Sequence, residues 1–262
     1  MDLGLQGKVA IIGASSKGLG KASALALARE GARVCLCART LAELQAAAAD
    51  ISGETGAEVL TVQADLATAA GVGSVVDAAV ARFGTVDVLV ANSGGPALGS
   101  FGDFSDDDWR QAFEIVTLNF VRFVRAVVPH MRARHWGRII GIQSSSVKQP
   151  VHGIDLSNGL RAGVAGLMKA ITPELAADGI TVNLVLPGRF LTSRISSEAG
   201  RSPQQDEALQ ARLAPLATGI PLGRLGYPIE LGNVVAFLAS EQASYVTGAV
   251  YQVDGGYIVS NV

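Results

Sequence analysis

The chain has 262 residues, of which 49% are apolar, a length and composition that fit one large or two small folded α/β domains and exclude a disordered chain. The net charge of −2 without a basic run argues against a nucleic-acid partner, and the absence of a secretory pattern or of an apolar run of about 18 residues predicts a cytoplasmic protein without membrane contact. Cys35 and Cys37 lie two residues apart in one apparent strand, so they would point to one side and are poorly placed to bridge each other, which favours a reducing compartment.

Strand-like and helix-like segments alternate along the chain. Strands are expected at 9–12, 34–38, 59–63, 86–91, 138–142, 181–186 and 249–253. Helices are expected at about 18–30, 40–50, 68–83, 105–134, 154–178 and 228–240. This alternation predicts a doubly wound Rossmann-type α/β fold, with a parallel sheet of about seven strands and helices on both faces. No linker is evident, so 1–262 is interpreted as a single domain, with a substrate lid at 188–227 and a helix in it near 206–216.

A glycine-rich turn connects the first strand to the first helix. Gly13, Gly18 and Gly20 would let the backbone approach a ligand closely and would leave helix N–H groups free to bind a pyrophosphate. The other residues of the turn that we expect to contact this ligand are Ser15, Ser16, Lys17 and Leu19. The alternative is a tight turn that binds nothing.

The end of the second strand indicates which dinucleotide is bound. An acidic residue at this place suits a free ribose 2′-hydroxyl, whereas an arginine suits a 2′-phosphate. The chain has Arg39 there and Lys17 in the glycine turn, and together they favour NADP, with NAD as the alternative. Either cation alone would be interpreted as a solvated surface charge.

Polar and glycine residues also follow the third and fourth strands. Asp65 and Leu66 come after the third strand, where Asp65 is either a helix cap or an acceptor for the adenine amine. Asn92, Ser93 and Gly94 come after the fourth strand, at the edge where open parallel sheets bind ligands. A plain turn is the alternative for Asn92.

Ser105 is expected to cap the long helix at 105–134, and Asn119 lies in its middle. Asparagine is a poor helix former, so Asn119 either faces solvent or points into a site.

These motifs resemble those of the short-chain dehydrogenase/reductase family along nearly the whole chain, and most of all the branch that includes 3-oxoacyl-carrier-protein reductases. The matching positions are the glycine turn (Gly13, Gly18 and Gly20), the Asn-Ala-Gly motif (Asn92, Ser93 and Gly94), the helix asparagine (Asn119), the Pro-Gly turn after the sixth strand (Pro187 and Gly188) and the nicotinamide-amide contact (Thr192). The resemblance implies a nicotinamide cofactor, a small-molecule or acyl-thioester substrate, and a homodimer or homotetramer. No metal is expected.

The catalytic segment departs from the family pattern. The family has a tyrosine four residues before a lysine and a serine about thirteen residues before the tyrosine; in this chain Ser157 stands at the tyrosine place, Arg161 at the lysine place and Ser144 at the serine place. The chain therefore resembles an atypical subgroup that lacks the usual tyrosine and lysine. By this alignment Arg161 also binds the cofactor ribose.

The replacement changes the chemistry that the segment can perform. Serine is a far weaker acid than tyrosine, and an arginine stays protonated and cannot relay a proton. Ser144 and Ser157 would polarise a carbonyl as an oxyanion hole does. His152 or Lys148 would supply acid/base function, unless they are loop residues that face solvent.

The sequence thus predicts an NADP-dependent oxidoreductase that interconverts a carbonyl and an alcohol, with a non-standard proton donor. One alternative is a nicotinamide-nucleotide-binding protein with little or no redox activity, acting as a sensor or partner subunit. Another is an elimination or isomerisation that retains the cofactor.

Overall fold

The computed structural model describes residues 1–195 and 207–260, and these residues form one parallel sheet of seven strands in the order β3-β2-β1-β4-β5-β6-β7. The strands are β1 (Val9–Ile12), β2 (Arg33–Ala38), β3 (Val59–Gln63), β4 (Val88–Ala91), β5 (Gly137–Ile142), β6 (Ile180–Pro187) and β7 (Val250–Val253). The expected fold class is confirmed. Strand order reverses between β1 and β4, and in open parallel sheets this is the point at which ligands bind.

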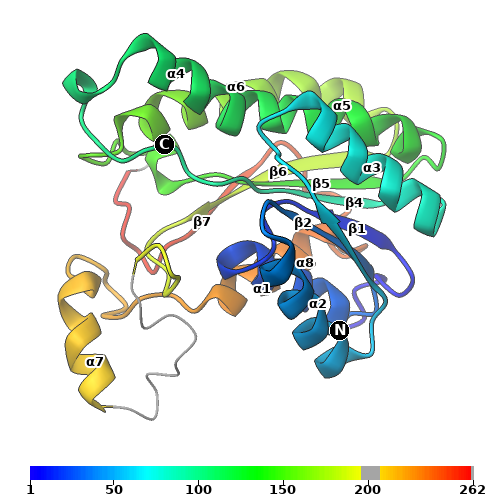
Figure 1. Ribbon diagram of the computed structural model, residues 1–262, viewed down its shortest axis with the longest axis horizontal. Coiled ribbons are helices and arrows are strands. Elements are labelled where there is room, and N and C mark those ends of the chain that lie inside the picture. Colours follow the sequence, from blue (N-terminus) through cyan, green and yellow to red (C-terminus); the bar gives the residue numbers. More distant parts are fainter. Residues whose placement is uncertain (196–206, 261–262) are drawn as a thin grey trace.

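Helices cover both faces of the sheet (Figure 1). One face carries α1 (Gly18–Arg29), α2 (Leu41–Thr55) and α8 (Pro228–Ala239). The other face carries α3 (Ala69–Phe83), α4 (Asp106–Phe113), α5 (Asn119–Arg132) and α6 (Asp155–Ala176). None of the helices in the described residues combines the length and the apolar character that crossing a bilayer requires.

The central strands β1 and β4 are apolar without interruption because both of their faces are covered. Neighbouring Ile11 and Ile12 are both fully buried but belong to the cores on opposite sides of the sheet, as the alternation of side chains along a strand requires. Cys35 and Cys37 share one face, as expected, and both are buried free thiols. Burial raises the pKa of the Cys35 thiol to about 12, which leaves it protonated and unreactive.

The long helix predicted at 105–134 differs from the structure in its middle. Ser105 caps α4 as expected, accepting a hydrogen bond from the Asp108 N–H, but a π-helical turn at Glu114–Leu118 separates α4 from α5. The Asn119 N–H bonds to the Glu114 carbonyl, five residues back, which widens the helix at this point. This turn has no signature in hydrophobic periodicity, so the sequence predicted an uninterrupted helix.

The segment after β6 forms a small unit with its own core. Its described part contains α7 (Glu207–Leu213) and a 3-10 turn (Ala214–Ala217), whereas positions 196–206 of the predicted lid lie outside the described residues. The buried apolar side chains of the unit are Leu191, Leu209, Leu213, Ala217, Ile220 and Leu225. Figure 1 shows α7 standing apart from the two helix layers.

The contact between α1 and α8 generates a prediction about stability. Gly232 of α8 faces the Ala22 carbonyl of α1, and a Cβ added at Gly232 would lie 2.5 Å from that oxygen. We expect Gly232→Ala to lower the free energy of unfolding by about 1–3 kcal/mol, because the two helices must separate. Urea denaturation measures the change.

Gly53→Ala is the matched control, since Gly53 lies within α2 and an added Cβ there meets nothing within 4 Å. It should preserve stability or raise it by up to about 1 kcal/mol. Equal losses in the two variants would contradict the role assigned to the α1–α8 contact.

Candidate active site

The glycine turn is held against the end of β4. A Cβ at Gly13 would collide with the backbone carbonyl of Asn92, so only glycine allows this approach. The Asn92 Nδ2 donates hydrogen bonds to the carbonyls of Gly13 (3.1 Å) and Ala14 (3.4 Å). Asn92 therefore fixes the turn at the strand-order reversal, where the sequence predicted a ligand.

The start of α1 fits the pyrophosphate of a dinucleotide. Gly18 adopts the left-handed conformation, with φ of +59°, and the Lys17 side chain at the N-cap makes no capping hydrogen bond to the helix. The first N–H groups of the helix thus keep their capacity for an anion. A Cβ at Gly18 would meet only Thr192, at 3.5 Å, and one at Gly94 would meet nothing within 4 Å, so the backbone leaves room on both sides.

Ser15 and Ser16, both predicted to bind the cofactor, lie differently in the turn. Ser15 is fully buried; its hydroxyl donates to the Ile12 carbonyl (2.8 Å) and accepts from the Cys37 N–H (2.9 Å), which ties the turn to β2. The Ser16 hydroxyl donates to Glu43 Oε2 at 3.2 Å. Ser15 shapes the turn, whereas Ser16 lies on its outer side.

An acidic residue accompanies the cations that the sequence placed at the 2′-phosphate. The Lys17 ammonium lies 3.1 Å from Glu43 Oε1, and this hydrogen bond and its charge, followed by the Ser16 hydroxyl, lower the pKa of the Glu43 carboxyl. Arg39 is exposed, and no ion pair engages its guanidinium in the described part of the chain. Sequence reasoning missed Glu43, although its place in the first turn of α2, beside the glycine turn, could have drawn attention to it.

Asp65 and Asn119 meet at the loop that follows β3. Asp65 does not cap α3: its carboxylate accepts from the Ala67 N–H (3.0 Å), and the cap is Thr68, whose hydroxyl accepts from the Gly71 N–H. That alternative for Asp65 was wrong. The buried Asn119 donates from Nδ2 to the backbone carbonyl after Asp65, that of Leu66, at 2.8 Å.

Asn119 thereby braces the loop after β3, and among the described residues its amide forms no hydrogen bond with the predicted catalytic residues Ser144 and Ser157. Ser93, on the next loop, bonds within its own turn, to the Gly94 carbonyl.

Three of the predicted catalytic residues, Ser144, Ser157 and Arg161, lie at the carboxyl end of β5. Arg161 on α6 donates from Nε to the Ser157 hydroxyl at 3.1 Å, and from Nη1 to Gln143 Oε1 at 3.1 Å and the Ile142 carbonyl at 3.4 Å. Ser157 and Arg161 are each only 7% exposed. Ser144 directly follows Gln143, so the three positions read from the family pattern share one site.

The Arg161 guanidinium is buried with neutral partners. Burial first, and the charge of Arg194 second, lower the pKa of Arg161 to about 10, so it remains protonated at neutral pH. No carboxylate among residues 1–195 and 207–260 forms an ion pair with it.

His152 and Lys148 are not drawn into this cluster. His152 is exposed and Lys148 half-buried, and in the described chain neither forms a hydrogen bond with Ser144 or Ser157. The structure therefore does not join them to the site.

The end of β6 completes the edge. Pro187 ends the strand, the Gly188 N–H bonds to the Val253 carbonyl (3.0 Å), and a Cβ at Gly188 would come within 2.6 Å of Asp254. The chain then brings Thr192 over Gly18. Thr192 thus lies beside the glycine turn, and its contact with the nicotinamide amide stays a prediction.

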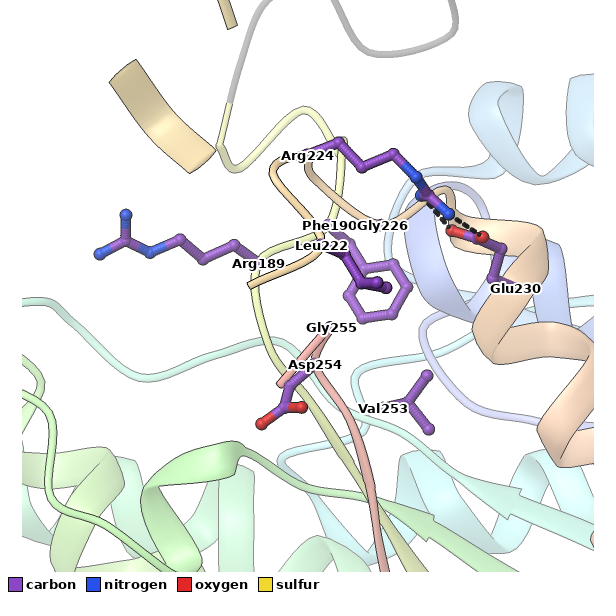
Figure 2. A pocket seen from close by; sticks show the side chains of 9 residues that line it. All are labelled: Arg189, Phe190, Leu222, Arg224, Gly226, Glu230, Val253, Asp254 and Gly255. Atoms are coloured by element: carbon purple, nitrogen blue, oxygen red, sulfur yellow. Dashed lines mark hydrogen bonds and ion pairs between the residues drawn. The ribbon is translucent and has the colours of Figure 1, made fainter. Parts of the chain in front are cut away.

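A separate pocket lies between this segment, the start of α8 and the chain after β7 (Figure 2). Arg224 and Glu230 at its rim form two hydrogen bonds with each other, of 2.7 and 2.9 Å, while Figure 2 shows Arg189 extending away from Phe190. Because its main charges already neutralise each other and none of the predicted site residues lines it, we do not assign the chemistry to this pocket.

Fold and site together define a dinucleotide-binding α/β protein with a polar cluster suited to carbonyl chemistry. The family profile described as Enoyl-(Acyl carrier protein) reductase matches residues 13–258. Oxidoreductase UcpA of Escherichia coli (strain K12) is 35% identical over 253 residues, covering 96% of this chain and 95% of the relative. The 3-oxoacyl-[acyl-carrier-protein] reductase FabG of the same strain is 33% identical over 254 residues, covering 97% and 98%.

Among solved structures, L-sorbose reductase from Gluconobacter frateurii, complexed with NADPH and L-sorbose, superposes with a TM-score of 0.92 at 35% identity, covering 99% of this chain and all of that one. The chain belongs to the short-chain dehydrogenase/reductase family. The family, the fold and a nicotinamide dinucleotide cofactor, all expected from the sequence, are confirmed.

The Lys17–Glu43 pair generates a prediction about nucleotide preference. Glu43→Gln removes the carboxylate that pairs with Lys17 and would free the Lys17 ammonium for the 2′-phosphate that it is predicted to bind. We expect NADPH to bind about three- to tenfold more tightly and NADH to bind as before, as fluorescence titration would show.

Glu54→Gln, at the other end of α2, removes a carboxylate that pairs with Arg29 instead and should leave both affinities unchanged. If Glu43→Gln changed the NADPH and NADH affinities equally, Glu43 would not face the 2′ position.

Proposed function

We propose that the protein is an NADP-dependent oxidoreductase that interconverts a carbonyl and an alcohol. The observation that carries this proposal is the cluster of Ser144, Ser157 and Arg161 at the carboxyl end of β5, beside a glycine turn that fits a dinucleotide. The cluster has hydroxyl donors and a fixed positive charge at the edge where the nicotinamide end of the cofactor would lie.

Hydrogen bonding leaves both hydroxyl protons available for a substrate oxygen. The Ser144 oxygen accepts from the Ser146 N–H (3.1 Å), and the Ser157 oxygen accepts from Arg161 Nε (3.1 Å). Since each hydroxyl oxygen already accepts a bond, its O–H can donate to a carbonyl oxygen. Two such donors form an oxyanion hole in which Arg161 polarises Ser157.

When bound, the nicotinamide supplies or removes a hydride. Ser144 and Ser157 then orient the substrate oxygen and stabilise the negative charge that develops on it. Arg161 strengthens the Ser157 donor but keeps its own proton at neutral pH. The proton that completes alcohol formation therefore comes from water, through Ser157, and not from Arg161.

The relatives support NADP and a carbonyl substrate. FabG is named as a 3-oxoacyl-carrier-protein reductase, and the sorbose reductase was solved with NADPH and a sugar. We infer a small-molecule or acyl-thioester substrate, NADP with Lys17 and Arg39 near its 2′-phosphate, and a cytoplasmic homodimer or homotetramer.

One observation favours a second candidate, a nicotinamide-nucleotide-binding protein with little redox activity. Arg161 donates its hydrogen bonds to Ser157, to Gln143 and to a backbone carbonyl. Ser157 stands where the family has tyrosine, and serine is a much weaker acid than tyrosine. A sensor or partner subunit would need the cofactor site and not the proton donor.

Titration with NADPH and NADH, followed by turnover on ketones and 3-oxoacyl thioesters, separates the two candidates. The reductase predicts tight NADPH binding with turnover. In that case Ser144→Ala should lower kcat by about 100-fold or more at unchanged NADPH affinity, since an oxyanion-hole donor is lost.

His152→Ala is the control, because His152 is exposed and not hydrogen-bonded to the serines in the described residues. It should retain full turnover; a large loss would restore the histidine as the acid. Tight NADPH binding without turnover on the whole panel would favour the binding protein.

A further inference from the structure

A second arginine reaches across the candidate active site. Arg194 lies after β6, yet its Nη2 donates to the carbonyl of Pro96, in the loop after β4, at 3.2 Å. Its guanidinium packs onto Gly95, where any Cβ would collide with it. Sequence reasoning singled out neither Arg194 nor this contact.

Sheet order places the Arg194 side chain at the same edge of the sheet as the cluster of Ser144, Ser157 and Arg161. In the sheet, β5 lies between β4 and β6, so a side chain that starts beyond β6 and ends beside the loop after β4 passes the carboxyl end of β5. Ser144 follows that end, and Arg161 bonds to the β5 residue Ile142. Arg161 and Arg194 therefore lie at the same edge of the sheet, and the charge of Arg194 lowers the pKa of Arg161.

These two positive charges have neutral partners. Arg161 bonds to a hydroxyl, an amide oxygen and a carbonyl, Arg194 bonds to a carbonyl, and in the described chain no acidic side chain pairs with either. Arg161 is buried whereas Arg194 is exposed, so the cost of burying a guanidinium without a counter-ion falls on Arg161, and the like charge of Arg194 adds to that cost. The ribose hydroxyls that the family alignment assigns to Arg161 are neutral, so they would not offset it.

We propose that the substrate carries a carboxylate in addition to its reducible carbonyl, and that this carboxylate binds between Arg161 and Arg194. The inference rests on the proposed function, since it names the substrate class of that site. A carboxylate would satisfy guanidinium donors on both sides and would leave the carbonyl facing Ser144 and Ser157. The pyrophosphate of the cofactor is the competing oxyanion for Arg194.

The test compares acids with their primary amides on protein saturated with NADP⁺, which has no hydride to give and so permits equilibrium measurement. The probes are 2-oxobutyrate, acetoacetate and levulinate, in which the carboxylate stands at increasing distance from the ketone. Calorimetry on the wild type should find at least one acid bound tenfold or more tightly than its amide. Arg194→Gln should abolish that preference, and Arg194→Lys should retain part of it.

Arg29→Gln is the matched control, since it also removes one positive charge but lies in the last turn of α1, where the side chain pairs with Glu54. It should keep the wild-type preference. The positively charged nicotinamide is common to all variants, so a loss confined to Arg194→Gln reports on Arg194 itself.

Three outcomes would overturn the proposal: no acid binds more tightly than its amide, Arg194→Gln leaves the preference intact, or Arg194→Gln weakens NADP⁺ itself while the acid-to-amide ratio persists. The last outcome would assign Arg194 to the pyrophosphate. These measurements need no turnover, so the two proposals can fail separately. A protein without turnover would refute the proposed reductase activity but would leave the carboxylate proposal to the binding data. An active protein that binds acids no more tightly than amides would refute the carboxylate proposal alone.

Discussion

The candidate site depends on how closely β1 and β4 approach each other where strand order reverses. Gly13 leaves no space for a side chain against the Asn92 carbonyl, and the Asn92 amide in turn bonds to the Gly13 carbonyl. This contact sets the glycine turn and the N-terminus of α1 at the carboxyl edge of the sheet. The cluster on β5 and α6 and the segment after β6 lie along the same edge, so their relation to a bound dinucleotide follows from this contact.

Local pattern predicted the sheet, most helices and the glycine turn, because buried parallel strands and amphipathic helices have distinct periods. Local pattern did not predict the role of a residue whose contacts lie in another helix, strand or loop. The π-turn before Asn119 keeps an apolar pattern like that of a plain helix. Glu43 and Arg194 find their partners only when α2 meets the glycine turn and the segment after β6 meets the loop after β4.

The predicted catalytic residues show the same division between what the sequence predicts and what other elements decide. The family pattern predicted that Ser144, Ser157 and Arg161 lie together, and the structure bonds Arg161 to Ser157 and to Gln143, the residue before Ser144. Spacing could not tell that Arg161 would be buried or that Gln143 would accept its second hydrogen bond. Whether His152 reaches the site depends on the path of the loop that carries it, and no short sequence pattern predicts that path.

Arginine at the position where the family has lysine also restricts how the charged group at this site can be oriented. The guanidinium is planar and spreads its donors over Ser157, Gln143 and the β5 backbone, so its orientation is fixed by three neutral acceptors. A lysine ammonium at this position would lack that planar spread of donors. The cluster is therefore a rigid source of positive potential more than a proton carrier.

The Lys17–Glu43 pair has a consequence for how this protein can diverge. It lies on the outer side of the glycine turn and shares no hydrogen-bonding partner with Arg161 or Ser157. Substitutions in groups without shared partners combine additively in free energy. On the predicted role of this pair in nucleotide preference, substitutions at Lys17 or Glu43 would change which pool of reducing equivalents a descendant of this chain uses without disturbing Ser157 and Arg161.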